Sequence, residues 1–202
     1  MWRDDELSGG EDGTALEPGN QALLQHWDSL KAGRTAPRRA DLDPRQMRRL
    51  LPRMFMAESD GLDGYSWRLA GTGLRQLFHR EMTGRDFLEG WTKLERGVIC
   101  RFLAGVIEDH RPVALRLRLH TDRGQAIQVE MLALPLLSKD GVTTRIMGSF
   151  SPLDEPQTEP HGAITEMQLA AARFLTRPVI ASDAAQVVAA RRQFRVIAGG
   201  LS

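Results

Sequence analysis

Few side chains in this 202-residue chain are of the types that perform covalent or acid–base chemistry, and none falls into a catalytic pattern. Cys100 is the only cysteine, and no evident histidine partner accompanies it in the sequence. The short patterns of a serine nucleophile elbow, a phosphate-binding loop and a zinc-protease helix do not occur. Asp86 and Glu89 lie too close to a predicted turn to be assigned as an acid pair. We therefore expect no catalytic residues and no enzyme activity.

Histidines can ligate metals, but their spacing here does not favour a metal centre. No two of the five histidines are separated as metal ligands usually are. His79 and His110 each fall at the predicted C-terminal end of a helix, where the helix dipole and the free carbonyl groups account for a histidine. His120 alternates with arginines that are expected to face outward. We expect no metal ligands.

Arginines form the most conspicuous charged group. Six of them cluster within 16 residues and could bind an anion, a nucleic acid or a membrane surface: Arg38, Arg39, Arg45, Arg48, Arg49 and Arg53. Two acids interrupt the cluster, and no aromatic side chain alternates with it for stacking on bases. The pattern favours a solvated or partner-facing surface, with Arg45, Arg48 and Arg49 as candidates. A nucleic-acid-binding regulator that uses the Arg38–Arg53 cluster is the alternative.

The elements that must position these side chains are organised around the stretch from Tyr65 to Trp91. Residues 65–70 alternate between two faces, which indicates a half-buried strand. Two glycines end that strand, and the apolar residues of 74–78 recur at helical spacing. A turn at 83–85 then precedes another short apolar segment. A strand, a short helix and a turn within 27 residues predict a small sheet with helices on one face.

The flanking segments extend this pattern on both sides. Residues 94–108 predict a mostly buried helix, because their apolar residues form adjacent stripes. Three strands with turns between them, at 113–119, 127–137 and 142–150, predict an antiparallel meander. Upstream of residue 65 we expect a helix capped by Asn20, a short helix after Asp43, and a first strand at 53–58. Downstream of residue 150 we expect helices at 164–174 and 183–197.

Composition limits the location and the domain count. Residues 1–18 hold six acids and one base, although the whole chain has a net charge of +1. The single cysteine excludes an internal disulfide and indicates a reducing compartment, so we expect a cytoplasmic protein. No apolar run approaches the roughly 20 residues of a membrane span, and no signal peptide is expected. We expect a disordered acidic N-terminus at 1–19, one domain at 20–153, and a linker with a helical extension at 154–202.

The predicted order of two strands, three helices and three strands is similar to that of a PAS domain. The runs RADLDPRQMRRLLPRMFMAE, YSWRLAGTGLRQLFHREMTGRDF and VTTRIMGSF resemble a family of stand-alone PAS proteins common in proteobacteria, and the closing FRVIAGG resembles the tail of that family. The resemblance covers roughly residues 20–155. It implies an α+β fold with a five-stranded antiparallel sheet and helices on one face. It also implies a sensory or regulatory module that acts through partner proteins.

Two cofactors are known from PAS sensors, and the sequence supports neither. Cys100 begins a string, CRFLAG, that is similar to the NCRFLQG string of flavin-binding LOV photosensors. In the LOV pattern, however, that cysteine follows a Gly-Arg on a short helix after the second strand, and the matching segment here, 81–88, has no cysteine. Cys100 is instead expected to pack as a small apolar residue on the long helix. Haem would need a pocket-facing histidine, which the pattern does not provide, so the cofactor is unknown.

A small ligand could occupy a pocket on the inner side of the predicted sheet. The candidates are apolar residues expected to face that side, namely Trp67, Leu69, Phe78, Phe87, Trp91, Phe102, Val106, Leu117 and Val129. The simpler interpretation, which the pattern favours, is that the same residues fill the core. Arg68, Arg116 and Arg118 are expected on the opposite, exposed face with Gln128 and Glu130, and this face is a second candidate surface for signalling partners or a homodimer.

Overall fold

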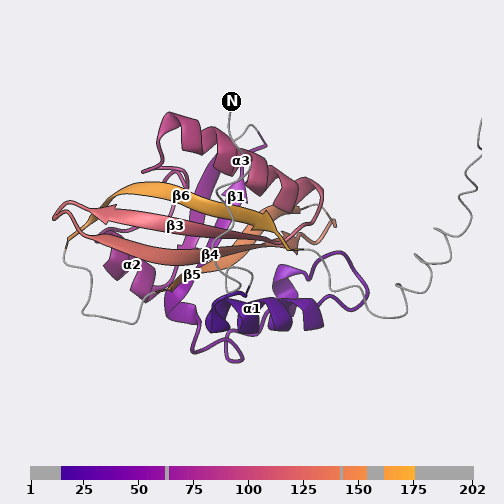
Figure 1. Cartoon of the computed structure of the whole chain (residues 1–202). Helices are drawn as coiled ribbons and strands as arrows, with labels where there is room; N and C mark the ends of the chain where they lie inside the picture. The colour runs from indigo at the N-terminus through magenta and orange to yellow at the C-terminus, as the bar shows by residue number, and fades with distance from the viewer. Residues whose placement is uncertain (1–14, 62–63, 142, 154–161, 176–202) are drawn as a thin grey trace, which may run out of the picture.

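A computed structural model describes residues 15–61, 64–141, 143–153 and 162–175. They form a six-stranded antiparallel sheet in the order β2-β1-β5-β4-β3-β6, with helices on both faces (Figure 1). The strands are β1 (Met54–Ser59), β2 (Tyr65–Ala70), β3 (Val113–Thr121), β4 (Ala126–Leu137), β5 (Thr143–Pro152) and β6 (Ile164–Phe174). The helices are α1 (Pro18–Ser29), α2 (Thr72–Phe78) and α3 (Lys93–Glu108), with short 3-10 turns η1 (Arg39–Asp41) and η2 (Leu51–Arg53).

The predicted meander is confirmed, with β3, β4 and β5 paired as antiparallel neighbours. Gly124, at a φ of +76°, allows the tight turn between β3 and β4, and its N–H donates to the carbonyl of Thr121 at 3.0 Å. Residues 129–137 of β4 are all buried rather than alternately exposed. The reason is that helices cover the sheet on both faces at this strand.

The inner layer consists of α2, α3 and the loop between them. The hydroxyl of Thr92 caps α3 by accepting from the N–H of Glu95, and Ile99, Leu103 and Val106 face the sheet. Leu94 was expected on the buried stripe, but it is 82% exposed in the first turn of α3. The buried surface of α3 therefore begins one turn later than the sequence pattern predicts.

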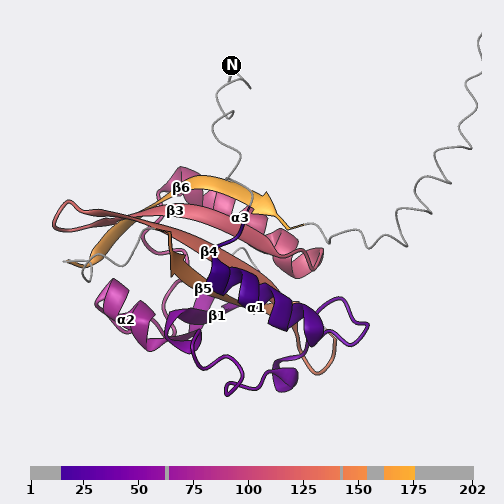
Figure 2. The ribbon, with the colours of Figure 1, turned by 60° about the horizontal axis from the view of Figure 1, so that its bottom comes forward.

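The outer layer is built by α1 and the segment that links it to β1. Leu23 and Trp27 of α1 pack on Leu132, Leu134 and Met147 of the sheet. The indole N–H of Trp27 also donates to the carbonyl of Pro135 at 2.8 Å. Figure 2 shows α1 in front of the sheet and α3 behind it. The segment expected to form a helix after Asp43 instead consists of turns that end in η2.

Asn20 does not cap α1 as the sequence predicts, because the helix begins earlier. Glu17 is the N-cap, with its carboxylate accepting from the N–H of Asn20 at 3.0 Å, and Pro18 is the first helical residue. Asn20 is fully buried against the sheet. Its amide donates to the side chain and the carbonyl of Glu130, each at 3.0 Å, and its oxygen accepts from Ser149 and Ser151. This polar group fixes α1 on the outer face.

The sheet has a sixth strand where the sequence predicts a helix. Residues 164–174 form β6, which pairs along the whole length of β3. Gly90 accepts from the N–H of Met167, and Glu95 accepts from the N–H of Leu169, each at 2.9 Å, so the loop and helix of the inner layer satisfy part of the β6 edge. The helix expected at 183–197 lies outside the described residues. Among those residues, no helix is long and apolar enough to cross a membrane.

Candidate functional site

Eight of the nine predicted pocket residues lie in or against the inner core. Six are buried in it, namely Trp67, Phe78, Phe87, Val106, Leu117 and Val129. Trp91 and Phe102 are partly buried and pack against the core. These eight side chains therefore gather in the inner layer.

These inner side chains contact one another. The ring centroids of Trp67 and Phe87 are 4.6 Å apart, and those of Phe55 and Phe87 are 5.1 Å apart. Phe150 packs 5.5 Å from Phe55 and lies stacked 6.2 Å from Trp67. Contacts at these distances are those of a packed aromatic core. A ligand between Trp67 and Phe87 would first have to separate the two rings.

Leu69 is the ninth predicted pocket residue, and unlike the other eight it does not face the inner core. Its side chain is 42% exposed and lies outside the inner core. The register between β1 and β2 shifts between Met56 and Ala57, so that Ala57 pairs with Trp67 while Met56 pairs with Leu69. The extra residue, Arg68, breaks the simple alternation that placed Leu69 beside Trp67.

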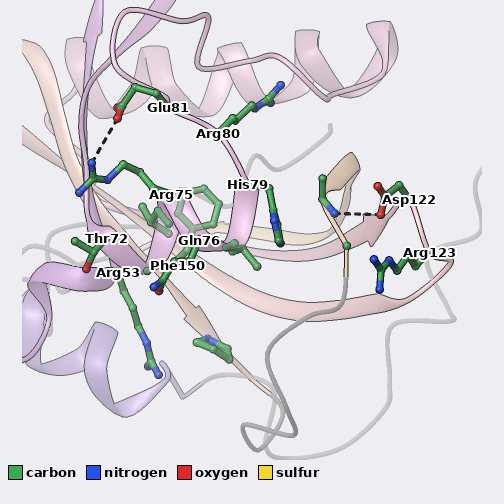
Figure 3. A pocket seen from close by; sticks show the side chains of 16 residues that line it. Arg53, Thr72, Arg75, Gln76, His79, Arg80, Glu81, Asp122, Arg123 and Phe150 are labelled. Carbon is green, nitrogen blue, oxygen red and sulfur yellow. Dashed lines mark hydrogen bonds and ion pairs between the residues drawn. The ribbon is translucent and has the colours of Figure 1, made fainter.

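A groove lies at one end of the sheet. It has a volume of about 960 Å³ and lies between α2, the end of η2, the β3–β4 turn and the adjoining ends of β5 and β6 (Figure 3). We call it the α2 groove. None of the nine predicted pocket residues lines it. Sequence reasoning missed it because its walls come from five segments that are far apart in the chain.

The walls of the α2 groove are held by close backbone contacts. A Cβ atom on Gly71 would lie 2.1 Å from the carbonyl oxygen of Leu51, so only glycine allows α2 to start this close to η2. At the other end of α2, His79 adopts a left-handed conformation with a φ of +50° and donates its N–H to the carbonyl of Gln76. Across the groove, Asp122 exchanges hydrogen bonds with the backbone of Ala163, which joins the β3–β4 turn to the start of β6.

The charged side chains of the α2 groove differ in how well they are paired. Arg75 contacts Glu81 at 3.4 Å, and Arg80 contacts Glu89 at 2.9 Å. Hydrogen bonds from the N–H and hydroxyl of Thr83, with further ones from Met82 and Arg75, hold the pKa of Glu81 below its ordinary value. In contrast, Arg53 and Arg123 form no ion pair with any described residue.

The predicted partner-surface arginines fall into separate regions. Arg45, Arg48 and Arg49 are exposed on the segment before β1 and form no ion pair within the described part of the chain. Arg116 and Arg118 lie on the outer side of β3. They do not share one continuous exposed face with Arg68 of β2, because α1 covers the strands between them.

Two acids on the outer side of the sheet, Glu130 and Glu58, already have partners within the protein. Glu130 was expected to be exposed, but the N-terminus of α1 buries it to 1% exposure, and Arg116 is 4.0 Å away. Glu58 of β1 contacts both Arg68 and Arg145. Partial burial opposes ionisation of Glu58, but the hydrogen bonds from Arg145 and Arg68 outweigh it and lower the pKa of this carboxyl.

The cysteine and the histidines take up the positions that the sequence indicates. Cys100 lies on α3 and packs against the inner core, as predicted. His110 follows the end of α3, and its Nε2 lies 2.8 Å from the hydroxyl of Thr143. Groups of three or more metal-ligating side chains are absent from the described residues.

An antiparallel sheet with short helices over its inner face defines a domain of the α+β class. A family model described as the PAS domain matches residues 16–151, and the chain therefore belongs to the PAS domain family. The predicted PAS fold is confirmed, with six strands instead of five. PAS domains typically sense or relay signals, so this domain has a sensory or regulatory role. The strand β6 lies beyond the matched span.

Solved structures similar to the chain include light-oxygen-voltage domains. One, studied with a flavin analogue, is 12% identical, with 55% of this chain and 84% of that chain covered and a TM-score of 0.44. The light-state structure of the blue-light photoreceptor Aureochrome1 LOV is 15% identical, with coverages of 55% and 88% and a TM-score of 0.41. An RNA-binding light-oxygen-voltage receptor is 17% identical, with coverages of 73% and 37% and a TM-score of 0.42. No curated protein matches the chain.

Proposed function

We propose that this PAS domain is a non-catalytic regulatory module that acts in signal transduction by binding partner proteins. The main support is the contrast between its interior and its surface. The predicted pocket residues pack on one another, with Trp67 and Phe87 rings 4.6 Å apart. On the surface, Arg118 of β3 is exposed and forms no ion pair with a described residue. Surface cations without an internal partner are available to acidic groups of another protein.

The surface around Arg116 and Arg118 is the proposed contact site, and an acidic surface of a signalling protein is the proposed partner. The test is a crosslinked pull-down from the native host with the wild-type protein and with the double variant Arg116→Glu/Arg118→Glu. Arg101→Glu/Arg96→Glu on α3 is the control of equal charge change. We expect the first variant alone to lose a specific partner. Equal recovery of the same proteins by all three baits would contradict the proposal.

A homodimer and a cytoplasmic location are part of the same proposal. The outer face of β3 and β6 is the surface proposed to meet a second copy. Sedimentation velocity over a concentration series tests the dimer, and a mass that stays monomeric at every concentration would count against it. Fractionation of the native host tests the location.

Nucleic-acid binding is the second candidate function, and one observation favours it. Every arginine of the Arg38–Arg53 cluster is exposed and forms no ion pair with a described residue. Such a cluster would bind polyanions with an affinity that falls steeply as salt increases. A gel shift with duplex DNA and with RNA at low salt tests this candidate. The absence of any shift would remove it.

A further inference from the structure

We propose that the α2 groove is a binding site for a small amphiphilic anion, an organic molecule that carries one carboxylate or phosphate group on an apolar body. Its volume of about 960 Å³ is at the upper end of the usual range for small-molecule sites. This site is distinct from the inner pocket expected from the sequence. The inference adds a ligand to the regulatory function proposed above, but it does not depend on partner binding.

The charges around the α2 groove favour an anion. Four arginines line it, against the two acids Glu81 and Asp122. Both acids are already used by the protein, because Glu81 accepts from Thr83 and Arg75, and Asp122 accepts from the backbone of Ala163. The four arginines outnumber the two acids, and Arg53 and Arg123 form no ion pair with a described residue. Guanidinium groups bind carboxylate and phosphate oxygens through paired hydrogen bonds.

The positions of these groups suit a ligand whose anionic group lies against one of the two arginines while its apolar body lies across the groove. Figure 3 shows Arg53 on one wall and Arg123 on the other, with the ring of His79 between them. Arg53 ends η2, His79 ends α2, and Arg123 lies in the β3–β4 turn, so each comes from a different element. The backbone contacts of Gly71 and Asp122 fix those elements without the ligand. The site is thus largely formed in advance.

Apolar side chains provide a floor for the body of the ligand. Leu74, Leu77 and Phe150 all line the α2 groove. Phe150 also stacks on Trp67 at a centroid distance of 6.2 Å. A ligand on Phe150 therefore touches the inner core through a single ring, and its binding should change the fluorescence of Trp67.

The test is a titration of the full chain with 1-naphthyl phosphate and with 2-naphthoate, with neutral 2-naphthalenemethanol and inorganic phosphate as comparisons. Calorimetry is the primary measurement, since the naphthyl group itself fluoresces, and amide chemical shifts locate the site. We expect saturable 1:1 binding of at least one naphthyl anion and at least tenfold weaker binding of both comparison compounds. Naphthyl phosphate and naphthoate together distinguish a phosphate ligand from a carboxylate ligand.

The matched variants are Arg53→Gln/Arg123→Gln in the α2 groove and Arg48→Gln/Arg101→Gln outside it. All four side chains are exposed, so both proteins should fold, and thermal unfolding verifies this. We expect the groove variant to bind the preferred anion at least tenfold more weakly and the other variant to bind it normally. No saturable binding of either anion, or equal weakening in both variants, would overturn the proposal. Neither result would affect the Arg116 and Arg118 partner test.

Discussion

Asn20 is the third residue of α1, and its fully buried side chain lies between Glu130 of β4 and two serines of β5. Both polar atoms of its amide group form hydrogen bonds: the nitrogen donates to Glu130, and the oxygen accepts from Ser149 and Ser151. Sequence reasoning assigned it as a helix cap because asparagine is common there. The buried role depends on partners more than 100 residues away in sequence, which local spacing cannot indicate.

We expect Asn20→Ala to destabilise the fold by about 1–3 kcal/mol, because it leaves two buried hydroxyl groups without their partner and removes one of the hydrogen bonds to the Glu130 carboxylate. Urea unfolding measures the change. Gln21→Ala is the matched control, since Gln21 is the next residue of α1 and is exposed. A loss of stability equal to that of the control would show that the Asn20 contacts do not hold α1 on the sheet.

Glu58 should make stability depend on acid pH. Burial alone would raise the pKa of Glu58, but Arg145 and Arg68 bring it below 4.5 in the folded protein. A carboxyl with a lowered pKa stabilises the fold above its unfolded pKa and loses that contribution as pH falls through the folded pKa. The stability difference between wild type and Glu58→Gln should therefore shrink from about pH 6 to about pH 3.

The control for this pH series is Glu108→Gln, at an exposed carboxyl that forms no ion pair with a described residue. Its stability difference from wild type should stay nearly constant with pH. A Glu58→Gln difference that is likewise constant would mean that the two arginines do not stabilise the ionised form.

At the scale of elements, the neighbouring strands β3 and β6 show why the sequence predicts one strand correctly and the other as a helix. Regular alternation made β3 easy to predict. In β6 the register with β3 shifts at two places, so the inward residues are Ile164, Met167, Leu169, Ala172 and Phe174. Two extra residues in a strand produce spacings of two and three that imitate a helical stripe. The apolar pattern at 164–174 was therefore assigned to a helix.

The packing of β6 on α3 can be tested at one glycine. A Cβ on Gly105 of α3 would lie 2.7 Å from the Cζ atom of Phe174, at the end of β6. We expect Gly105→Ala to displace that ring, to cost about 1–3 kcal/mol and to increase amide exchange in β6. Urea unfolding and hydrogen exchange measure the two effects.

Gly97 offers the matched control on the same helix. A Cβ there would meet no atom within 4 Å. Gly97→Ala should instead stabilise the protein by about 0.5–1 kcal/mol, because alanine loses less backbone entropy in a helix. If both alanine variants had the same effect on stability, contact with Phe174 would not be the cause.

The candidate site shows the same limit of sequence reasoning. Alternation predicts the inner residues, such as Trp67 and Leu117, because the apolar pattern within a single strand indicates which side of it is buried. The α2 groove combines Arg53, His79 and Arg123, which lie in three segments and have no shared periodicity. Only the tertiary arrangement brings them together, and the sequence contains no signal that would have paired them.

For the molecule as a whole, the sheet is a partition between two apolar layers. The inner layer contains the aromatic core, and the outer layer is closed by α1 over Leu132, Leu134 and Met147. The sequence predicted helices over one face and did not assign a packing surface to α1. The apolar stripe of α1 is visible in the sequence, but an amphipathic pattern does not indicate which face of a sheet the helix covers.

We expect Leu23→Asp to detach α1, because it places an unpaired carboxylate in the outer layer. The uncovered strands should then bind a hydrophobic dye and make the protein associate with itself. Dye fluorescence and sedimentation velocity measure these changes. Leu94→Asp is the control, since Leu94 is 82% exposed and its replacement should leave both signals unchanged. A Leu23→Asp protein with unchanged dye binding and mass would contradict the covering role of α1.

The end of β6 is fastened at the corner where α3 meets β3. The ring of Phe174 lies 5.2 Å from that of Phe102 and 3.9 Å from the guanidinium of Arg111, and the N–H of Leu175 donates to the carbonyl of Pro112 at 2.8 Å. Three contacts therefore hold the last described residues, Phe174 and Leu175, at that corner. Because Phe174 packs on both Phe102 and the Gly105 position of α3, a displacement of α3 would also move the end of β6.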